Sequence, residues 1–367
     1  QSRGLGDVYK RQEISEIFAK AFYIAKSGRP GPVLIDITKD AQFEILKTFE
    51  YKKCKKIRSY SSVPAIDNKS LKNAADIINN AKKPFVVWGQ GVILGNAENE
   101  FKAFLEKSGI PAAWTILGLS ALPTDHPLNV GMVGMHGNYG PNKLTNECDV
   151  LIAIGMRFDD RVTGSLNTYA KQAKIIHFEI DPAEVNKNVK VDVAVLGDVK
   201  ETIKEILPLI KSKNHDKWID EFHNYYKIEY DKVIDNEYNK KKGGLSMAEV
   251  IKSINNNTEG ESILVTDVGQ HQMVACRYTK FKLSKSNITS GGLGTMGFAL
   301  PAALGAKIGD PKREVIAVIG DGGFQMTIQE LGTIFQTKAA VQIVIVNICF
   351  VGLGRLWLRL FFDERYA

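Results

Sequence analysis

The sequence lacks the features that mark several special classes of protein. It has only four cysteines in 367 residues, with no CxxC spacing and no histidines at zinc-finger intervals: Cys54, Cys148, Cys276 and Cys349. This excludes a disulfide scaffold and predicts free thiols in a reducing compartment, which we take to be the cytoplasm. No apolar run approaches the roughly 18 residues that a membrane helix needs, and even the run at 341–346 soon meets Asn347. With 32 glycines and 12 prolines, collagen and low-complexity sequence are also excluded.

The charge is basic, but it is not arranged as in a nucleic-acid site. Lysine and arginine number 48 against 41 acidic residues, a net charge of +7. The local clusters, at 52–56 and 240–242, are not interleaved with aromatic residues as in a base-stacking groove. We therefore expect a solvated basic surface and no binding of nucleic acid.

The length predicts two or three domains, and the first appears only in part. Residues 1–12 have no helical or strand period and are left out of the fold. Residues 13–57 hold a predicted helix at 14–25 and a predicted buried strand at 33–37, too little for a core, so we interpret them as the end of a domain. Residues 42–66 have no period, and we place a linker at 58–66.

The next unit, 67–210, alternates strands with helices. Strands are predicted at 85–88, 150–154 and 175–179, and helices at 71–80 and 98–107. Such alternation predicts an α/β fold with a parallel sheet in a three-layer α/β/α arrangement, whose ligands lie at the carboxyl ends of the strands.

The last unit, 246–367, repeats the pattern after a charged linker at 211–245, of which residues 211–242 suggest a surface helix joining domains. Ser246 and Glu249 form a predicted capping box. A strand at 263–266, a small-residue helix after 290–298, a buried strand ending in GDGG, a helix at 327–337 and a second buried strand at 341–350 follow.

The GDGG segment, residues 320–323, has the composition of a phosphate-binding turn. Glycines let backbone amides approach a phosphate, and Asp321 could hold a divalent ion beside it. Such turns are common, so this signal alone is weak. Ile348 follows Asp321 by 27 residues, which fits one helix and one strand and would bring two strand ends together.

The combined motifs resemble a known family. GDGGFQMTIQELGTIFQT followed by a strand is similar to the thiamine diphosphate and magnesium motif of thiamine-dependent decarboxylases and carboligases. SGRPGPVLIDITKDAQ, VGMVGMHGNYGPN, LIAIGMRFDDRVTG and SGGLGTMGFALPAALGA narrow the resemblance to the large catalytic subunits of acetolactate synthases, from about residue 13 to residue 367.

The resemblance implies a domain order and a reaction. A pyrimidine-binding, an FAD-binding and a thiamine pyrophosphate-binding domain would follow one another, with most of the first, including its catalytic glutamate, outside this sequence. The reaction would condense two pyruvates, or pyruvate and 2-ketobutyrate, to 2-acetolactate or 2-aceto-2-hydroxybutyrate with loss of CO2, the first shared step of branched-chain amino-acid biosynthesis. A homodimer or tetramer and a regulatory small subunit are also implied.

The resemblance also assigns the thiamine diphosphate site. Met296 would hold the cofactor bent and Trp357 would shape the pocket of the second substrate. The remaining contacts would be Val268, Gly269, Gln270, His271, Gly294, Gly320, Asp321, Gly322, Gly323, Gly352 and Leu353. From the residues alone, His271 could equally be a helix-capping histidine and Met296 plain core.

The FAD site is assigned in the same way. Its contacts would be Arg29, Gly89, Gln90, Gly91, Thr115, Ile116, Leu117, Val133, Gly134, Met135, His136, Gly155, Arg157, Asp159, Arg161, Val162, Glu179, Ile180 and Asp198. Glycines would admit the diphosphate, arginines would bind its oxygens, and Glu179 would bind ribose hydroxyls. The alternative is that the charged residues at 157–161 form a surface ion-pair cluster.

The implied metal site departs from the family pattern. Mg²⁺ prefers six oxygen ligands. Asp321 supplies one and the Phe350 carbonyl could supply another, but Ile348, at the position of the family's asparagine ligand, has no donor. Asn347 cannot replace it if the strand continues, because neighbouring strand residues point to opposite faces. We therefore expect this chain by itself to bind Mg²⁺ and thiamine diphosphate poorly and to be inactive.

Two other interpretations stay open at this point. One is another thiamine-dependent enzyme, such as a pyruvate oxidase, a glyoxylate carboligase or a catabolic acetolactate synthase, against which GMRFDDRVTG favours an FAD-retaining synthase. The other is a non-catalytic flavin-binding or assembly module, consistent with Ile348 and with the missing glutamate.

Overall fold

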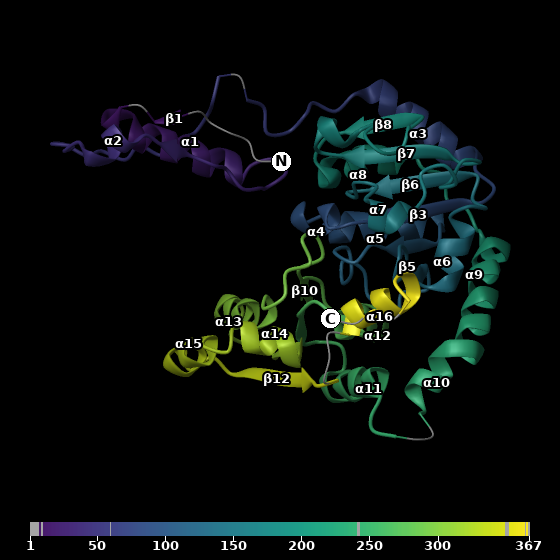
Figure 1. Ribbon diagram of the computed structural model, residues 1–367. Helices are drawn as coiled ribbons and strands as arrows, with labels where there is room; N and C mark the ends of the chain where they lie inside the picture. Colours follow the sequence, from purple (N-terminus) through teal and green to yellow (C-terminus); the bar gives the residue numbers. More distant parts are fainter. Residues whose placement is uncertain are drawn as a thin grey trace.

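Two parallel sheets organise the chain (Figure 1). The computed structural model describes residues 7–8, 10–58, 60–240, 243–348, 352–363 and 365. The larger sheet runs in the order β5 (Asn129–Met132), β4 (Ala112–Trp114), β3 (Pro84–Trp88), β6 (Val150–Ile154), β7 (Lys174–Glu179), β8 (Val193–Leu196). The smaller runs β10 (Asn287–Thr289), β9 (Ile263–Thr266), β11 (Val315–Gly320), β12 (Val341–Val346). All of these strand pairs are parallel, which confirms the predicted fold class.

The six-stranded sheet is covered on both faces because its central strands are apolar on both. In β3, Val86 and Trp88 pack into one core and Phe85 and Val87 into another, as expected for side chains that alternate along a strand. The first core receives helices α3 (Asn68–Asn80), α5 (Glu98–Ser108) and α8 (Val199–Ile206). The second receives α6 (Tyr139–Leu144) and α9 (Asp216–Glu229). Two short helices, α4 (Gly91–Leu94) and α7 (Asp160–Thr163), follow β3 and β6.

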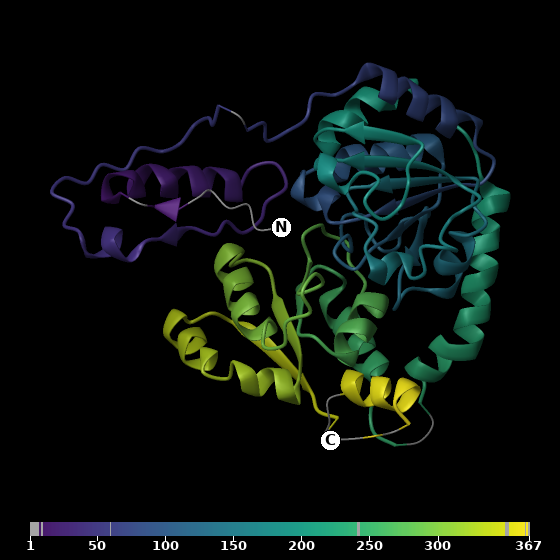
Figure 2. The same cartoon turned by 45° about the horizontal axis from the view of Figure 1, so that its top comes forward.

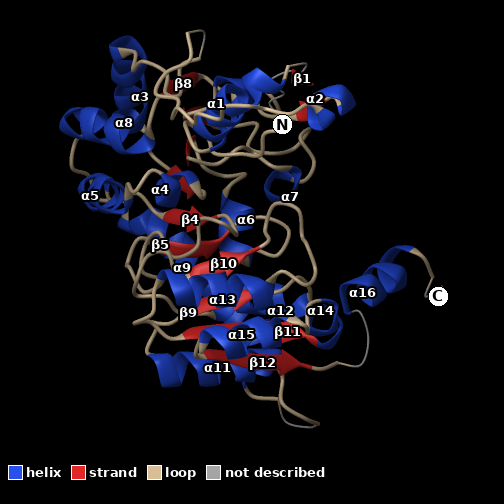
Figure 3. Ribbon diagram, turned by 90° about the vertical axis from the view of Figure 1, so that its left-hand side faces the viewer, coloured by secondary structure: helices blue, strands red, loops and turns tan. Residues whose placement is uncertain are grey.

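The four-stranded sheet is also covered by helices on both faces. Ile263 and Val265 of β9 pack against α13 (Ala299–Gly309), while Leu264 packs toward α11 (Met247–Thr258) and α12 (Gln270–Tyr278). The core that holds Leu264 also holds Trp88, so one hydrophobic cluster joins both units. Figure 3 shows the strands of both sheets in red with their helices around them. The predicted capping box is confirmed at the start of α11.

Each sheet reverses its strand order next to the first of its strands in the chain. β3 lies between β4 and β6, and β9 lies between β10 and β11. At such a point the two connections that follow neighbouring strands cross to opposite faces of the sheet. They leave a crevice between them at the carboxyl ends of the strands. The two reversals therefore mark the two places where this fold can hold a ligand.

The predicted charged linker at 211–245 is largely helical. α9 continues through a π-helical turn, Tyr230–Ile234, into α10 (Asp235–Tyr238), along the side of both units (Figure 1). Trp218 and Phe222 of α9 are buried in the second core of the six-stranded sheet. The segment is therefore part of the packed structure rather than a surface connection only.

The helices and strands before residue 45 lie to one side of the two sheets (Figure 2), although Arg29 contacts the loop after β7. They include α1 (Ile14–Ala25), as predicted, and α2 (Lys39–Phe43). The predicted buried strand at 33–37 is wrong: only β2 (Asp36–Ile37) is extended, paired with β1 (Asp7–Val8), and Leu34 is 69% exposed. A two-residue strand with one short neighbour has no sheet face for a helix to cover.

Two predictions in the last unit need correction. The strand predicted as buried at 341–350 ends at Val346 and is an edge strand, with Ile345 46% exposed. The GDGG segment is not a separate glycine turn, because α14 (Asp321–Met326) begins directly after β11. α15 (Glu330–Thr337) and α16 (Gly352–Phe361) complete the described elements, together with short 3-10 turns at Arg11–Glu13, Pro182–Glu184 and Leu207–Leu209. No helix among the described residues is long and apolar enough to cross a membrane.

Candidate functional site

Four separate segments meet at the carboxyl edge of the four-stranded sheet. Met296 Cε lies 3.7 Å from the position that a Cβ on Gly322 would take. Gln270 Nε2 donates a hydrogen bond of 3.3 Å to the carbonyl of Gly352. Ile348 Cδ1 lies 2.7 Å from the position that a Cβ on Gly352 would take. The structure thus brings together the predicted thiamine diphosphate residues of the turns after β9, β11 and β12 and of the loop before α13.

Asp267 organises this edge, although the sequence did not mark it as a site residue. It is fully buried, and its Oδ1 accepts hydrogen bonds from the amides of Val268 at 2.9 Å and Gly297 at 3.1 Å. Its Oδ2 accepts one from Ala299, the first residue of α13, at 3.0 Å. A buried carboxylate at a helix N-terminus is stabilised by such donors. The available signal was an acidic residue directly between a buried strand and a glycine-containing turn.

The Asp267 carboxylate leaves no room for a side chain at position 323. A Cβ on Gly323 would lie 2.5 Å from Asp267 Oδ1, whereas one on Gly322 would meet only the flexible end of Met296. Gly323 therefore permits close packing of α14 on the β9 turn. Gly322 leaves the backbone of the first turn of α14 open beside Met296, as the binding of a phosphate at a helix N-terminus needs.

His271 lies near the start of α12 with its ring between two glycine positions. The residue is 7% exposed, and its Cε1 lies 2.7 Å from the Cβ position of Gly269 and 3.2 Å from that of Gly320. Its Nε2 is buried without a hydrogen-bond partner, and no side chain caps α12. Burial lowers the imidazole pKa, against the opposing charges of Asp267 and Asp321. This neutral ring with an unused nitrogen fits a polar ligand better than the helix-capping interpretation does.

The residues do not fit a complete magnesium site. Asp321 is half-buried, but no group of three or more His, Cys, Asp or Glu residues that could hold a metal lies within the described parts of the chain. Ile348 brings a methyl group, and not an oxygen, to this edge. Phe350 and the side chain of Trp357 are outside the described residues. The expected mismatch with the family's metal site stays a prediction, because β12 ends at Val346, so strand alternation no longer excludes Asn347, and Phe350 lies outside the described residues.

Glycines let the turns after β3 and β6 of the larger sheet pack closely against each other. The amide of Gly91 donates to the carbonyl of Gly155 at 3.0 Å, and a Cβ on Gly89 would lie 2.5 Å from that carbonyl oxygen. Gly155 has φ +59°, which favours glycine. These three residues are thus explained by contact between the turns after β3 and β6, at the reversal of strand order.

Two further predicted FAD segments lie against each other. Met135 donates its amide to the carbonyl of Arg161 at 2.7 Å, and Gly134, with φ +105°, approaches the same carbonyl. Val133 is buried and Val162 packs against the same core. Burial lowers the pKa of His136, and the charge of Arg161 lowers it further.

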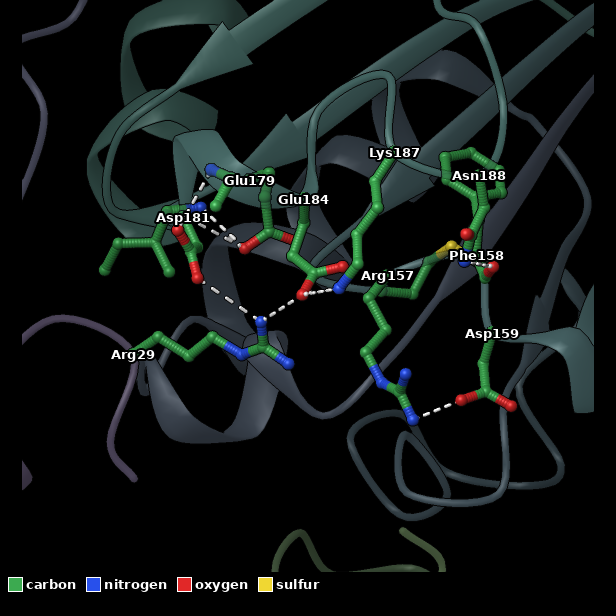
Figure 4. A network of polar contacts seen from close by, with 12 residues as sticks. Arg29, Arg157, Phe158, Asp159, Glu179, Asp181, Glu184, Lys187 and Asn188 are labelled. Carbon is green, nitrogen blue, oxygen red and sulfur yellow. Dashed lines mark hydrogen bonds and ion pairs between the residues drawn. The ribbon is translucent and has the colours of Figure 1, made fainter. Parts of the chain in front are cut away.

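The arginines predicted in the charged segment lie beside acidic residues of the same chain. Arg157 pairs with Asp159 (Figure 4), and Arg161 Nε lies 4.0 Å from Asp160 Oδ2. These contacts agree with the alternative prediction of a surface ion-pair cluster. Both arginine side chains are more than 40% exposed, so they can exchange their acidic partners for other anions.

Arg29 reaches across from the N-terminal residues to the loop after β7. Its Nη1 donates to Glu184 Oε1 at 2.7 Å and to Asp181 Oδ2 at 3.3 Å (Figure 4). Burial disfavours its charge, but Glu184, Glu179 and Asp181 together outweigh burial and raise the guanidinium pKa. Burial likewise opposes the charge of Glu184, yet the carboxyl pKa is lowered by Arg29 and Lys187.

The other predicted FAD residues serve local structure. Glu179 Oε1 accepts from the amides of Ile180 and Asp181, and Asp198 caps α8. Gln90 precedes α4, and Thr115 donates its amide to the carbonyl of Trp88. Ile116 and Leu117 face the Cβ position of Gly291 from the smaller unit. Of the remaining thiamine diphosphate residues, Gly294 has φ +64°, and Leu353 lies in α16.

The contact between Gly323 and Asp267 predicts unequal effects of two neighbouring substitutions. Gly323→Ala forces a methyl group against a fixed, buried carboxylate, so we expect the free energy of unfolding to fall by about 1–3 kcal/mol. Gly322→Ala is the matched control: its methyl group meets only the end of Met296, so we expect no loss, or a gain below about 1 kcal/mol from the reduced backbone freedom of the unfolded chain. Urea denaturation of both variants checks this; equal losses would contradict the packing role.

His271 predicts a dependence of stability on pH. Folding lowers the pKa of His271 from its ordinary value of 6.5. As the pH falls, the unfolded chain therefore binds the proton before the folded chain does. The free energy of unfolding thus decreases as the pH falls below about 6.5. One such group contributes at most about 1.4 kcal/mol per pH unit. His271→Gln should make the urea midpoint less sensitive to pH between 7 and 5. His223→Gln, an exposed histidine, serves as control and should leave the slope unchanged.

Comparison with known proteins agrees with this geometry. Residues 71–206 match the family described as "Thiamine pyrophosphate enzyme, central domain", and residues 267–367 match "Thiamine pyrophosphate enzyme, C-terminal TPP binding domain". The chain is 40% identical over 361 residues to the acetolactate synthase large subunit of Buchnera aphidicola subsp. Schizaphis graminum, covering 98% of this chain and 63% of the relative.

Two further relatives give the same result. Identity is 41% over 357 residues with the acetolactate synthase large subunit of Corynebacterium glutamicum, covering 97% and 57% of the two chains. It is 39% over 371 residues with the probable acetolactate synthase large subunit of Methanocaldococcus jannaschii, covering 98% and 62%. The chain thus spans 57–63% of the length of these curated relatives. It belongs to the thiamine pyrophosphate enzymes, and it is homologous over nearly its whole length to part of the acetolactate synthase large subunits.

Proposed function

We propose that this chain is part of an acetolactate synthase large subunit, an enzyme that joins two 2-keto acids with loss of CO2. Pyruvate would be the donor, and pyruvate or 2-ketobutyrate the acceptor. The observation that supports this most is the meeting of four motif segments at the strand reversal of the smaller sheet, beside a buried and unpaired His271 nitrogen. Homodimer or tetramer assembly and a regulatory small subunit are part of the proposal.

Thiamine diphosphate, when bound, supplies the electron sink that makes decarboxylation of a 2-keto acid feasible. In this proposal His271 donates or accepts a hydrogen bond through Nε2, depending on its tautomer, at the diphosphate end. The backbone amides of Gly322 and its neighbours complete that cradle. Met296, beside Gly322, supports the cofactor from the apolar side.

The larger sheet would hold FAD. The reversal between β3 and β6 is the position at which doubly wound sheets bind dinucleotides. Arg157 and Arg161, partly exposed at the carboxyl edge, would exchange their acidic neighbours for phosphate oxygens. The GMRFDDRVTG segment favours an acetolactate synthase that retains FAD over a catabolic one. Pyruvate oxidase and glyoxylate carboligase are the other thiamine-dependent enzymes that this segment does not exclude.

A second candidate is a non-catalytic flavin-binding or assembly module. Ile348 favours it, because the resemblance places this isoleucine at the position of the family's asparagine ligand, where Mg²⁺ would need an oxygen donor. On either interpretation we expect this chain alone to show no release of CO2 from pyruvate above the rate of the free cofactor.

Binding of thiamine diphosphate measured by isothermal titration separates the two candidates. The chain as it stands should bind weakly and equally with Mg²⁺ or with EDTA, since one carboxylate does not hold the ion. Ile348→Asn should raise the Mg²⁺-dependent affinity by about tenfold or more. Ile345→Asn, a half-exposed position of the strand that leads to Ile348, is the control and should have no effect. Tight Mg²⁺-dependent binding by the unaltered chain would refute the defect, and no gain in affinity from Ile348→Asn would favour the assembly module.

Retention of flavin tests the role of the larger sheet. After incubation with FAD and gel filtration, the chain should elute with flavin absorption. Arg161→Gln should reduce the flavin content several-fold, because it removes a charge that meets the diphosphate. Lys143→Gln, another half-exposed cation of the same unit, should not. An unaltered chain without flavin would remove FAD from the proposal.

A further inference from the structure

One buried carboxylate lies where the connecting helix passes from the larger to the smaller sheet unit. Trp218, Phe222, Tyr225 and Glu229 follow one another at helical spacing along the inward side of α9. The first two are buried apolar side chains, and Tyr225 packs its ring edge-on against Tyr139 at 5.2 Å. Glu229, at the next turn, is only 5% exposed. An acidic residue at such a position is rare unless it is paired.

The π-helical turn begins directly after Glu229. An α-helix would bring Lys232 or Val233 to the inward side, and both are exposed. The extra residue of the π turn instead brings Ile234 inward, 2% exposed, into the cluster that contains Ile251 and Ile254 of α11. π turns in helices are frequent at functional sites. Here the turn lets one helix present Glu229 to the larger unit and Ile234 to the smaller.

Glu229 contacts two other segments of the chain, α12 and the start of α6. Its Oε1 pairs with Nη2 of Arg277, in the last turn of α12. Its Oε2 accepts hydrogen bonds from the amide of Tyr139 at 3.0 Å and from Asn138 Nδ2 at 3.3 Å. The carboxylate therefore bridges the smaller unit and the start of α6 in the larger unit.

The contacts continue from both ends of this bridge. Asn138 Oδ1 accepts a hydrogen bond from the amide of Met132 at 2.9 Å, which fixes the base of the predicted flavin loop at 133–136. At the other end, Arg277 belongs to the helix whose first two residues, Gln270 and His271, lie in the predicted diphosphate site. A nine-residue helix is a rigid connection.

We propose that Glu229 is a positioning residue that clamps the loop at 131–139 to helix α12 and so holds the two cofactor sites in a fixed relation. The clamp itself rests on contacts within the chain, and only its role for the cofactors rests on the proposed function. Loss of the cation at position 277 leaves a buried carboxylate unpaired, so the side chain turns to water and releases the amide of Tyr139 and Asn138.

Amide hydrogen exchange of the whole chain, followed by mass spectrometry, tests the clamp without any cofactor. Arg277→Met should speed exchange in peptides covering 131–139 by about tenfold, within the range of site-to-site coupling, although Arg277 does not belong to that unit. Arg277→Lys keeps the positive charge and should restore most of the protection. Glu221→Gln is the matched control, since Glu221 lies on the same helix but pairs with Lys83 inside the larger unit.

The outcomes are distinct. Faster exchange at 131–139 with unchanged exchange in β3 supports the clamp, and unchanged exchange at 131–139 in Arg277→Met overturns it. Equal acceleration by Glu221→Gln also overturns it. If Arg277→Met unfolds the chain, seen as fast exchange in β3, the double variant Glu229→Gln with Arg277→Met removes both charges; local acceleration then supports the clamp and its absence refutes it.

A flavin readout then separates the clamp from the proposed function. Glu229→Gln should reduce the FAD retained after gel filtration several-fold if loop 133–136 binds flavin. Faster exchange without any flavin binding by the unaltered chain would leave the clamp valid and remove the FAD assignment. Normal exchange in a variant that retains less flavin would overturn the clamp while leaving the FAD assignment intact.

Discussion

The reversal of strand order inside each parallel sheet is the constraint on which the rest of the structure depends. A parallel sheet needs crossover helices, and those helices cover both faces only if the chain winds outward in both directions from an inner strand. In this chain β3 and β9 are those inner strands. The loops that follow them and their neighbours, β6 and β11, are therefore forced to the same edge, whatever their sequences.

That constraint explains why the turns have so many glycines. At the reversal of the larger sheet, Gly91 and Gly155 approach within backbone contact, so side chains are excluded before any ligand is considered. At the reversal of the smaller sheet, Gly323 makes room for Asp267, whereas Gly322 faces only Met296. A glycine-rich motif is thus a mixture of residues that serve packing and residues that leave backbone open. Only the three-dimensional contacts separate the two.

Much of this arrangement was predictable from the sequence, because strand and helix periods, glycine turns and a capping box are local signals. The strands β3, β6, β7 and β9 and the pairing of β11 with β12 were all anticipated from such signals. The burial of a strand was not predictable in this way. Residues 33–37 and 341–346 are largely apolar, but a strand is buried only if another strand and a helix cover it. Those neighbours come from elsewhere in the chain and leave no trace in the strand's own residues.

Asp267 and Glu229 were missed for a related reason. Each is an acidic residue whose importance depends on donors far away in sequence, the amides of Gly297 and Ala299 for Asp267 and Arg277 for Glu229. For Asp267 the local signal was only its place between a buried strand and a glycine-containing turn. For Glu229 a usable signal existed, since it continues the inward stripe of Trp218, Phe222 and Tyr225. A charged residue on an otherwise apolar stripe predicts a buried partner.

The π turn after Glu229 has a consequence for how this segment can evolve. One residue of α-helix corresponds to about 100° of rotation, so the extra residue sets the angular phase between the two sheet units as well as their separation. Substitution of a residue in 216–238 leaves this phase unchanged, whatever contacts it removes. Insertion or deletion of a single residue acts differently, since it would turn either Glu229 or Ile234 out of its place. The length of this helix is therefore more tightly constrained by the structure than its composition.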